Sequence, residues 1–148
     1  LKRFTGGVAY ILAGIFPALR SKRFKVKIRA GDNRFTGFVH QVIVVSGRDF
    51  GDHPILPNAS IVSGRLAVFT TTNGGPAGIA RDFLAIAQGR ETELPQAHWW
   101  TAKRVRIKTS APQRVAIDGR EIGETPARFK IDPRALNVFV PPDFDGTR

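Results

Sequence analysis

The residues of this sequence best suited to chemistry stand in the segment 117–121, Ile-Asp-Gly-Arg-Glu. Asp118 and Gly119 predict a tight two-residue turn between two strands. A carboxylate that projects from such a turn is well placed to accept a proton from a docked substrate hydroxyl. Asp118, Gly119 and Glu121 are therefore the candidate catalytic residues. A hairpin turn without any catalytic role is the alternative interpretation of the same residues.

Cationic side chains alternate with apolar ones in two segments, 23–29 and 101–109, which is typical of half-buried strands with one charged face. The cations are Lys25, Lys27 and Arg29 in the first segment, and Lys103, Arg106 and Lys108 in the second. The whole chain has 23 Lys and Arg against 12 Asp and Glu, a formal net charge of +11. Such an excess favours anionic partners, although a basic surface that is merely solvated would have the same composition.

Several classes of site are disfavoured. The chain has no Cys, which excludes disulfides, thiolate metal sites and Cys nucleophiles. It also lacks a Gly-rich phosphate loop and a Gly-x-Ser-x-Gly elbow. His40, His53 and His98 stand far apart in the sequence. Asp49 and Asp52 beside His53 could bind a cation, but acidic loop residues are more often only solvated.

Two adjacent tryptophans, Trp99 and Trp100, could stack on nucleic-acid bases. Neighbouring residues of a strand point to opposite faces, so at most one of them can form an exposed platform. We therefore expect one core and one edge tryptophan, and we do not expect nucleic acid as the partner.

The elements that must position these residues are mostly short strands. Helices are expected over 5–19 and from Pro76 to Gly89, and a loop of about twenty residues, longer than most connections, follows Val45. Strands are expected over 23–29, 35–45, 65–71, 101–109, 114–117, 127–131 and 136–140. This pattern predicts an α+β, mostly β fold, a β-sandwich-like lobe with two helices. Residues 1–148 are expected to form a single domain.

Several of these segments together resemble the C-terminal lobe of the diacylglycerol kinase catalytic family, which includes bacterial lipid kinases and sphingosine kinases. The similarity begins with a basic residue followed by Ala-Tyr in the first helix. It continues through a small residue and Gly before an aromatic-Gly pair, then Pro-x-Ala, then Gly-x-Leu, and ends with Asp-Gly before a final strand. The matching residues are Arg3, Ala9, Tyr10, Ser46, Gly47, Phe50, Gly51, Pro57, Ala59, Gly64, Leu66, Asp118 and Gly119.

The resemblance implies a two-lobe lipid kinase that transfers the ATP γ-phosphoryl group to a lipid hydroxyl. ATP and Mg²⁺ would belong to the longer protein, and none is expected on this fragment. The partners implied are the lipid substrate, an anionic membrane surface and the missing N-terminal lobe with its Gly-Gly-Asp-Gly-Thr nucleotide motif. The location implied is cytoplasmic and peripheral to the membrane. The chain begins at Leu1 and contains no Met, so we expect it to be a piece of a longer polypeptide.

Three positions depart from the family pattern. Relatives carry Asp-Gly-Glu where this chain has Asp118-Gly119-Arg120, and they carry acids where it has Ser63 and Ala67. The family uses those acids for its catalytic base and a structural magnesium. A one-residue shift turns a strand side chain to the other face, so Glu121 replaces the missing acid only if the turn is bulged. The second hypothesis is therefore a degenerate lobe that binds an anionic lipid or phosphorylated ligand without phosphoryl transfer. Under the lipid kinase hypothesis the cations of the two basic strands would meet anionic lipid headgroups. The candidate lipid- or anion-binding residues are Lys25, Lys27, Arg29 and Arg120.

Overall fold

The computed structural model describes residues 22–47, 49–50, 53–54, 60–72, 74–87, 90, 93–142 and 144. The helix expected over 5–19 and most of the long loop lie outside this part. The strands are β1 (Phe24–Ala30), β2 (Asn33–Val39), β3 (Val42–Val45), β4 (Asp49–Phe50), β5 (His53–Pro54), β6 (Leu66–Thr71), β7 (Ala97–Ala102), β8 (Arg104–Thr109), β9 (Arg114–Ile117), β10 (Arg120–Glu124) and β11 (Ala127–Lys130), and the helix is α2 (Pro76–Ala87).

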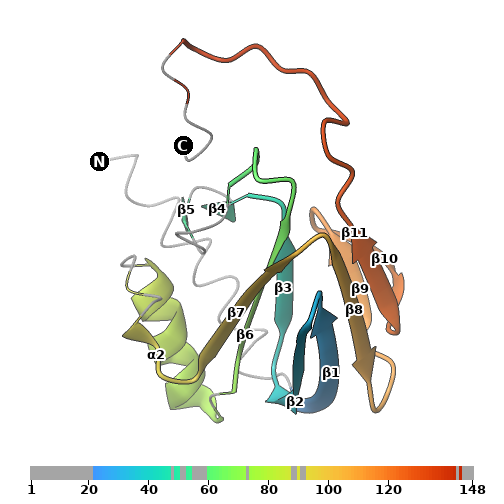
Figure 1. The fold of residues 1–148 in the computed structure, drawn as a ribbon. Helices are drawn as coiled ribbons and strands as arrows, with labels where there is room; N and C mark the ends of the chain where they lie inside the picture. The colour runs from blue at the N-terminus through green and yellow to red at the C-terminus, as the bar shows by residue number, and fades with distance from the viewer. Residues whose placement is uncertain are drawn as a thin grey trace.

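The described strands form two main antiparallel sheets and two ribbons (Figure 1). The outer sheet has the order β11-β8-β1-β2, and the inner sheet has the order β3-β6-β7. The two-stranded ribbons are β4–β5 and β9–β10. The expected fold class, α+β and mostly β with a β-sandwich-like arrangement, is confirmed.

The core lies between the two sheets. Val26 and Ile28 of the outer sheet are buried with Leu66 and Val68 of the inner sheet, and Trp100 packs against this cluster. The opposite face of the inner sheet buries a second cluster around Phe69, on which Trp99 packs. The two tryptophans therefore point to opposite faces, as the sequence predicts. Strand β6 is buried on both faces and is the centre of the lobe.

Two expected strands are each divided by a change of sheet. The strand expected over 35–45 is β2 up to Val39 and β3 from Val42, and these belong to different sheets. Val39 and Val42 both face the core, so the inward alternation shifts by one residue between them. The strand expected over 101–109 breaks in the same way at Lys103, between β7 and β8. Such bends form the corners of packed sheets.

The helix expected from Pro76 is confirmed over α2, which lies beside the inner sheet in Figure 1. Proline suits the first helical position because its missing N–H needs no partner there. A buried hydrogen bond joins the helix to the sheet: the Thr71 hydroxyl of β6 donates to Asp82 Oδ2 at 2.7 Å. Both residues are buried.

We expect Asp82→Ala to lower the free energy of unfolding by about 2–3 kcal/mol, because it takes this acceptor away from the buried Thr71 hydroxyl. Urea denaturation of the variant measures the change. Asp132→Ala is the matched control, since Asp132 is exposed and such substitutions stay within about 0.5 kcal/mol. Equal losses in the two variants would show that the Thr71–Asp82 bond contributes nothing.

The prediction of a strand over 136–140 is wrong. These residues are described, but they are not part of a strand and run away from the sheets in Figure 1. Their apolar side chains are strongly exposed, with Leu136 at 82% and Val138 at 67%. An alternating sequence forms a strand only where a partner strand takes its hydrogen bonds, and this segment meets none in the described part of the chain.

No described helix is long and apolar enough to cross a membrane.

Candidate functional site

The predicted turn at Asp118-Gly119 is a two-residue hairpin turn that joins β9 to β10. Ile117 pairs directly with Arg120, and both turn residues have positive φ, 48° at Asp118 and 79° at Gly119. Positive φ at both central positions is the geometry of the type I′ hairpin turn, which Asp-Gly favours. The Asp118 carboxylate is exposed at the tip of this ribbon. The turn is confirmed, and its catalytic role stays a prediction.

Glu121 lies on the ribbon just beyond the turn. Arg120 pairs with Ile117 and Glu121 pairs with Ala116 in regular register, and the bulge falls later, between Glu121 and Gly123. Because the turn itself is not bulged, Arg120 occupies the first strand position after Asp-Gly. Glu121 then faces the opposite side of the ribbon from Arg120, so the condition under which Glu121 would take the place of the missing acid is not met.

On its side of the ribbon Glu121 lies near a cation. Its Oε2 atom is 3.6 Å from Arg114 Nη1, and both side chains are largely exposed. An exposed pair of this kind contributes at most about 1 kcal/mol to stability. Glu121 is therefore an accessible carboxylate that remains available to a substrate.

The two positions where the family resemblance implies further acids do not fit a magnesium ion. Ser63 lies in a turn, where its hydroxyl donates to the Ser60 carbonyl oxygen at 2.6 Å. Ala67 is buried on β6. In the part of the chain that the structure describes, no three His, Asp or Glu side chains lie close enough to hold a metal. The possible cation site at Asp49, Asp52 and His53 lies outside the described side chains.

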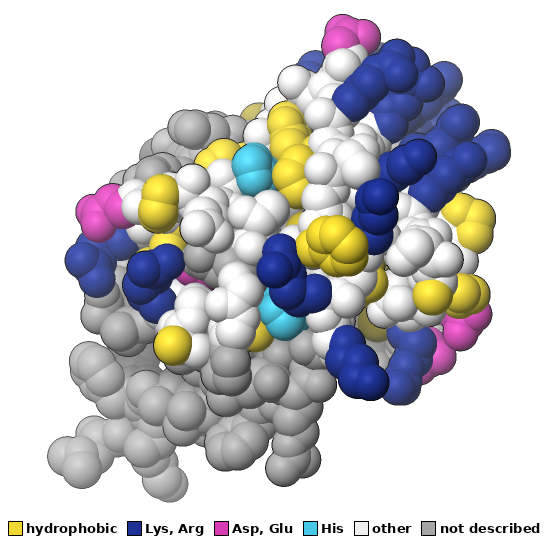
Figure 2. Space-filling view, turned by 90° about the horizontal axis from the view of Figure 1, so that it is seen from below, with side chains coloured by type: hydrophobic (Ala, Val, Ile, Leu, Met, Phe, Trp, Pro, Cys, Tyr) yellow, Lys and Arg dark blue, Asp and Glu magenta, His cyan; other side chains and the backbone are white. Residues whose placement is uncertain are grey.

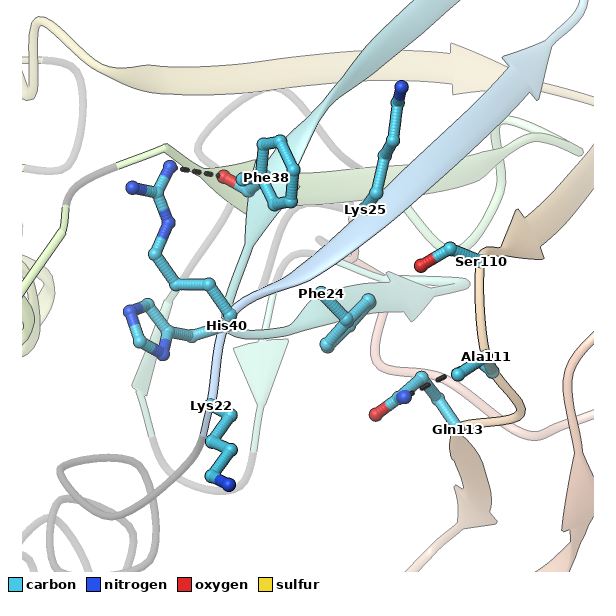
Figure 3. A pocket seen from close by; sticks show the side chains of 9 residues that line it. Lys22, Phe24, Lys25, Phe38, His40, Ser110, Ala111 and Gln113 are labelled. Carbon is cyan, nitrogen blue, oxygen red and sulfur yellow. Dashed lines mark hydrogen bonds between the residues drawn. The ribbon is translucent and has the colours of Figure 1, made fainter.

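A hollow of about 410 Å³ opens at one end of the outer sheet. In Figure 3 Phe24 lies at its centre, with Ser110 and Gln113 on the far side from His40. Among the described residues, no acidic side chain lines it; those that do are Lys22, Arg23, Phe24, Lys25, Phe38, His40, Ser110, Ala111 and Gln113. This composition suits a ligand that is both anionic and partly apolar.

Arg23 is held in place at the edge of this hollow. Its Nη2 atom donates to the carbonyl oxygens of Phe38 at 2.8 Å and Thr72 at 3.2 Å. The guanidinium carbon also lies 5.8 Å from the centre of the Phe38 ring, within cation–π range. The bond to Phe38 joins the residue just before β1 to the C-terminal end of β2, and it keeps the guanidinium group beside an exposed aromatic ring.

The outer sheet presents a continuous array of cations on its solvent side, which we call the cationic face. Every Lys and Arg of its four strands is exposed and alternates with inward-facing residues. In Figure 2 Lys and Arg side chains gather along one side of the molecule. The members are Lys25, Lys27, Arg29, Arg34, Arg104, Arg106, Lys108, Arg128 and Lys130.

Sequence reasoning found part of this face and missed the rest. The sequence predicts that Lys25, Lys27 and Arg29 are exposed on one strand, and the structure confirms their placement on β1. Lys103, in contrast, lies in the turn between β7 and β8 and outside the face. Arg34 and the two β11 cations, Arg128 and Lys130, join the face through strand pairing. The alternation of these cations with apolar residues in the sequence is the signal that could have placed them on the exposed side of a strand. Arg120 lies on the separate β9–β10 ribbon.

Comparison with known proteins gives consistent matches. Residues 2–140 match the family model of the YegS C-terminal NAD kinase beta sandwich-like domain. An uncharacterised protein of Synechocystis is 26% identical over 95% of this chain and 34% of its own length. A diacylglycerol kinase of Staphylococcus aureus is 23% identical over 97% of this chain and 46% of its own.

Among solved structures, a diacylglycerol kinase from Bacillus anthracis superposes with a TM-score of 0.65 at 23% sequence identity. The superposition covers 86% of this chain and 44% of that protein. At this identity the likeness concerns the fold alone. The chain thus spans between a third and half of the length of these relatives.

Proposed function

Since the chain belongs to the family of YegS C-terminal NAD kinase β-sandwich-like domains, the C-terminal lobe of diacylglycerol kinase-like proteins, we propose that it is one lobe of a longer lipid kinase. That enzyme would transfer the γ-phosphoryl group of ATP to the hydroxyl of a lipid. The observation that carries this proposal is the family match over residues 2–140, with relatives named diacylglycerol kinase that are more than twice as long.

In this proposal the lipid hydroxyl oxygen attacks the γ-phosphorus of ATP, the bond from that phosphorus to the β,γ-bridging oxygen breaks, and ADP leaves. Phosphoryl transfer of this kind depends mainly on positioning and on stabilisation of charge. The role of the present lobe is to present the lipid hydroxyl on the side of the β9–β10 ribbon that Glu121 occupies, opposite to Arg120, and to accept its proton at the Glu121 carboxylate. Mg·ATP would bind to the lobe that precedes this one.

The exposed segment 136–140 is consistent with a preceding lobe. Leu136, Val138 and Phe139 are among the most exposed apolar side chains of the described residues, with Phe139 fully exposed. A contiguous apolar segment of this kind usually marks an interface. Because relatives contain more than twice the length of this chain, we propose that the N-terminal lobe of the same polypeptide covers this segment.

The proposal is tested with the longer polypeptide and radiolabelled ATP. We expect transfer of label to diacylglycerol or another lipid alcohol dispersed in neutral detergent micelles, and we expect none with residues 1–148 alone. A folded full-length polypeptide that binds ATP but labels no lipid alcohol would contradict the proposal.

One observation favours a second candidate function. Arg120, a fixed cation, occupies the strand position directly after the Asp-Gly turn, and Glu121 faces the other way. A lobe arranged in this way could bind an anionic lipid or phosphorylated ligand without phosphoryl transfer. In the same assay this candidate gives no labelled lipid, yet the polypeptide retains binding to a phosphorylated lipid that Arg120→Gln weakens.

A further inference from the structure

We propose that the cationic face is a docking surface for a bilayer of anionic phospholipids, on which the solvent side of the outer sheet faces the membrane. This inference rests on the proposed function for the nature of the partner, because a lipid kinase must reach a substrate held in a membrane. The location and chemistry of the surface are argued from the sheet itself.

Four arginines form a line across all four strands of the outer sheet. Arg29 pairs directly with Arg34 on one side and with Arg106 on the other, and Arg106 pairs with Arg128. Neighbouring strands lie about 5 Å apart, so these guanidinium groups start from closely spaced backbone positions. A second pair of cations, Lys27 and Lys108, lies directly opposite each other in the next row.

This line of charge is not compensated within the sheet. Like charges directly opposite each other destabilise a sheet, and none of the four strands contains an Asp or Glu. The ion pairs Arg90–Glu93 and Arg114–Glu121 both lie outside the outer sheet. Repulsion within the cationic face therefore lowers the free energy of unfolding of the free protein. Bound anions relieve this repulsion.

The chemistry of the face suits phosphodiester headgroups in a plane. A guanidinium group binds two phosphate oxygens in a bidentate manner, and arginine is more weakly hydrated than lysine. The face also contains one exposed aromatic residue at its end: Phe38, 52% exposed, pairs with Lys25. Phe38 and Lys25 both line the hollow in Figure 3, where an apolar side chain could enter the headgroup region beside a cation.

Nucleic acid is the other polyanion with this charge pattern, and the structure favours it less. Binding of single strands uses exposed aromatic rings on which successive bases stack. Phe38 is the only aromatic residue on the solvent side of the four outer-sheet strands. Both tryptophans lie on the inner sheet and are partly buried in the two cores.

The test compares two triple variants of the full polypeptide with equal net charge. The first combines Arg29→Gln, Arg106→Gln and Arg128→Gln within the line of arginines. The control combines Lys103→Gln, Arg114→Gln and Arg134→Gln, three exposed cations outside the outer sheet. Binding to phosphatidylcholine vesicles with and without phosphatidylglycerol is measured by co-sedimentation in the absence of ATP, so the result does not depend on phosphoryl transfer.

We expect the first variant to bind phosphatidylglycerol vesicles about a hundredfold more weakly, because each cation near an anionic surface contributes roughly a factor of five. Binding of the wild-type protein should also weaken as salt rises from about 0.1 M to about 1 M, which shortens the Debye length from about 10 Å to about 3 Å. The control variant should retain most of its affinity. Urea denaturation should show the first variant to be at least as stable as wild type, because repulsion within the sheet has been removed.

Three results would overturn the proposal: an equal loss in the control variant, equal binding to vesicles without phosphatidylglycerol, or displacement from the vesicles by a DNA duplex at equal phosphate concentration. Vesicle binding that persists in a polypeptide without kinase activity would refute the proposed function and leave the docking surface standing. Kinase activity on micelles without any vesicle binding would refute the docking surface and leave the proposed function standing.

Discussion

Glu121→Gln in the full-length polypeptide is expected to lower kcat for lipid phosphorylation by about 10²–10⁴-fold, the usual contribution of a positioned general base. The amide keeps the size of the side chain but cannot accept the hydroxyl proton. Stability should change little, because the carboxylate is largely exposed and its partner Arg114 is more so. Initial rates at saturating lipid and ATP, with urea denaturation beside them, measure the two effects.

Glu124→Gln is the matched control for this prediction. Glu124 is an exposed acid on the same strand, directly opposite Arg114 in the ladder and further from the turn. We expect it to keep kcat within a few-fold of wild type, as a surface change away from the substrate should. If Glu121→Gln is as active as Glu124→Gln, Glu121 takes no part in the mechanism.

Asp118→Asn tests the other candidate carboxylate while it preserves the turn in which this residue lies. Asn adopts positive φ readily, so the turn with φ of 48° at this position should persist. A large loss of kcat in this variant together with normal activity in Glu121→Gln would move the proton acceptor from Glu121 to Asp118.

Phe69→Ala is expected to lower the free energy of unfolding by about 3–5 kcal/mol, the cost of removing a large aromatic side chain from a core. Phe69 is fully buried on β6, between Ile43 of β3 and Trp99 of β7. Its ring centre lies 5.0 Å from that of Trp99. A loss of this size approaches the whole stability of a small domain. Denaturation followed by tryptophan fluorescence measures it.

Phe38→Ala serves as the control because it removes the same side chain from an exposed site, 52% accessible on β2. We expect a loss below about 1 kcal/mol, since surface substitutions seldom cost more. Similar losses for Phe38→Ala and Phe69→Ala would mean that the inner sheet is not the centre of the folded lobe.

The sequence by itself determined the features that depend on near neighbours. Alternation over 23–29 predicted β1, Pro76 predicted the start of α2, and Asp118-Gly119 predicted a hairpin turn. Each of these signals operates within a few residues, through strand pleat, helix start or turn geometry. The family resemblance rests on such local motifs in order, and the match over residues 2–140 confirms it.

Tertiary structure decided everything that depends on pairing between distant segments. It divided residues 35–45 between two sheets at His40-Gln41 and left 136–140 without a partner strand. It also set the register that aligns Arg29 with Arg106 and Arg106 with Arg128. A strand's own sequence specifies which residues share a face, but the partner and register depend on burying both sheets in one core. For the same reason the sequence could name Asp118 and Glu121 as candidate acids, while only the regular pairing after the turn placed Arg120 and Glu121 on opposite sides of the ribbon.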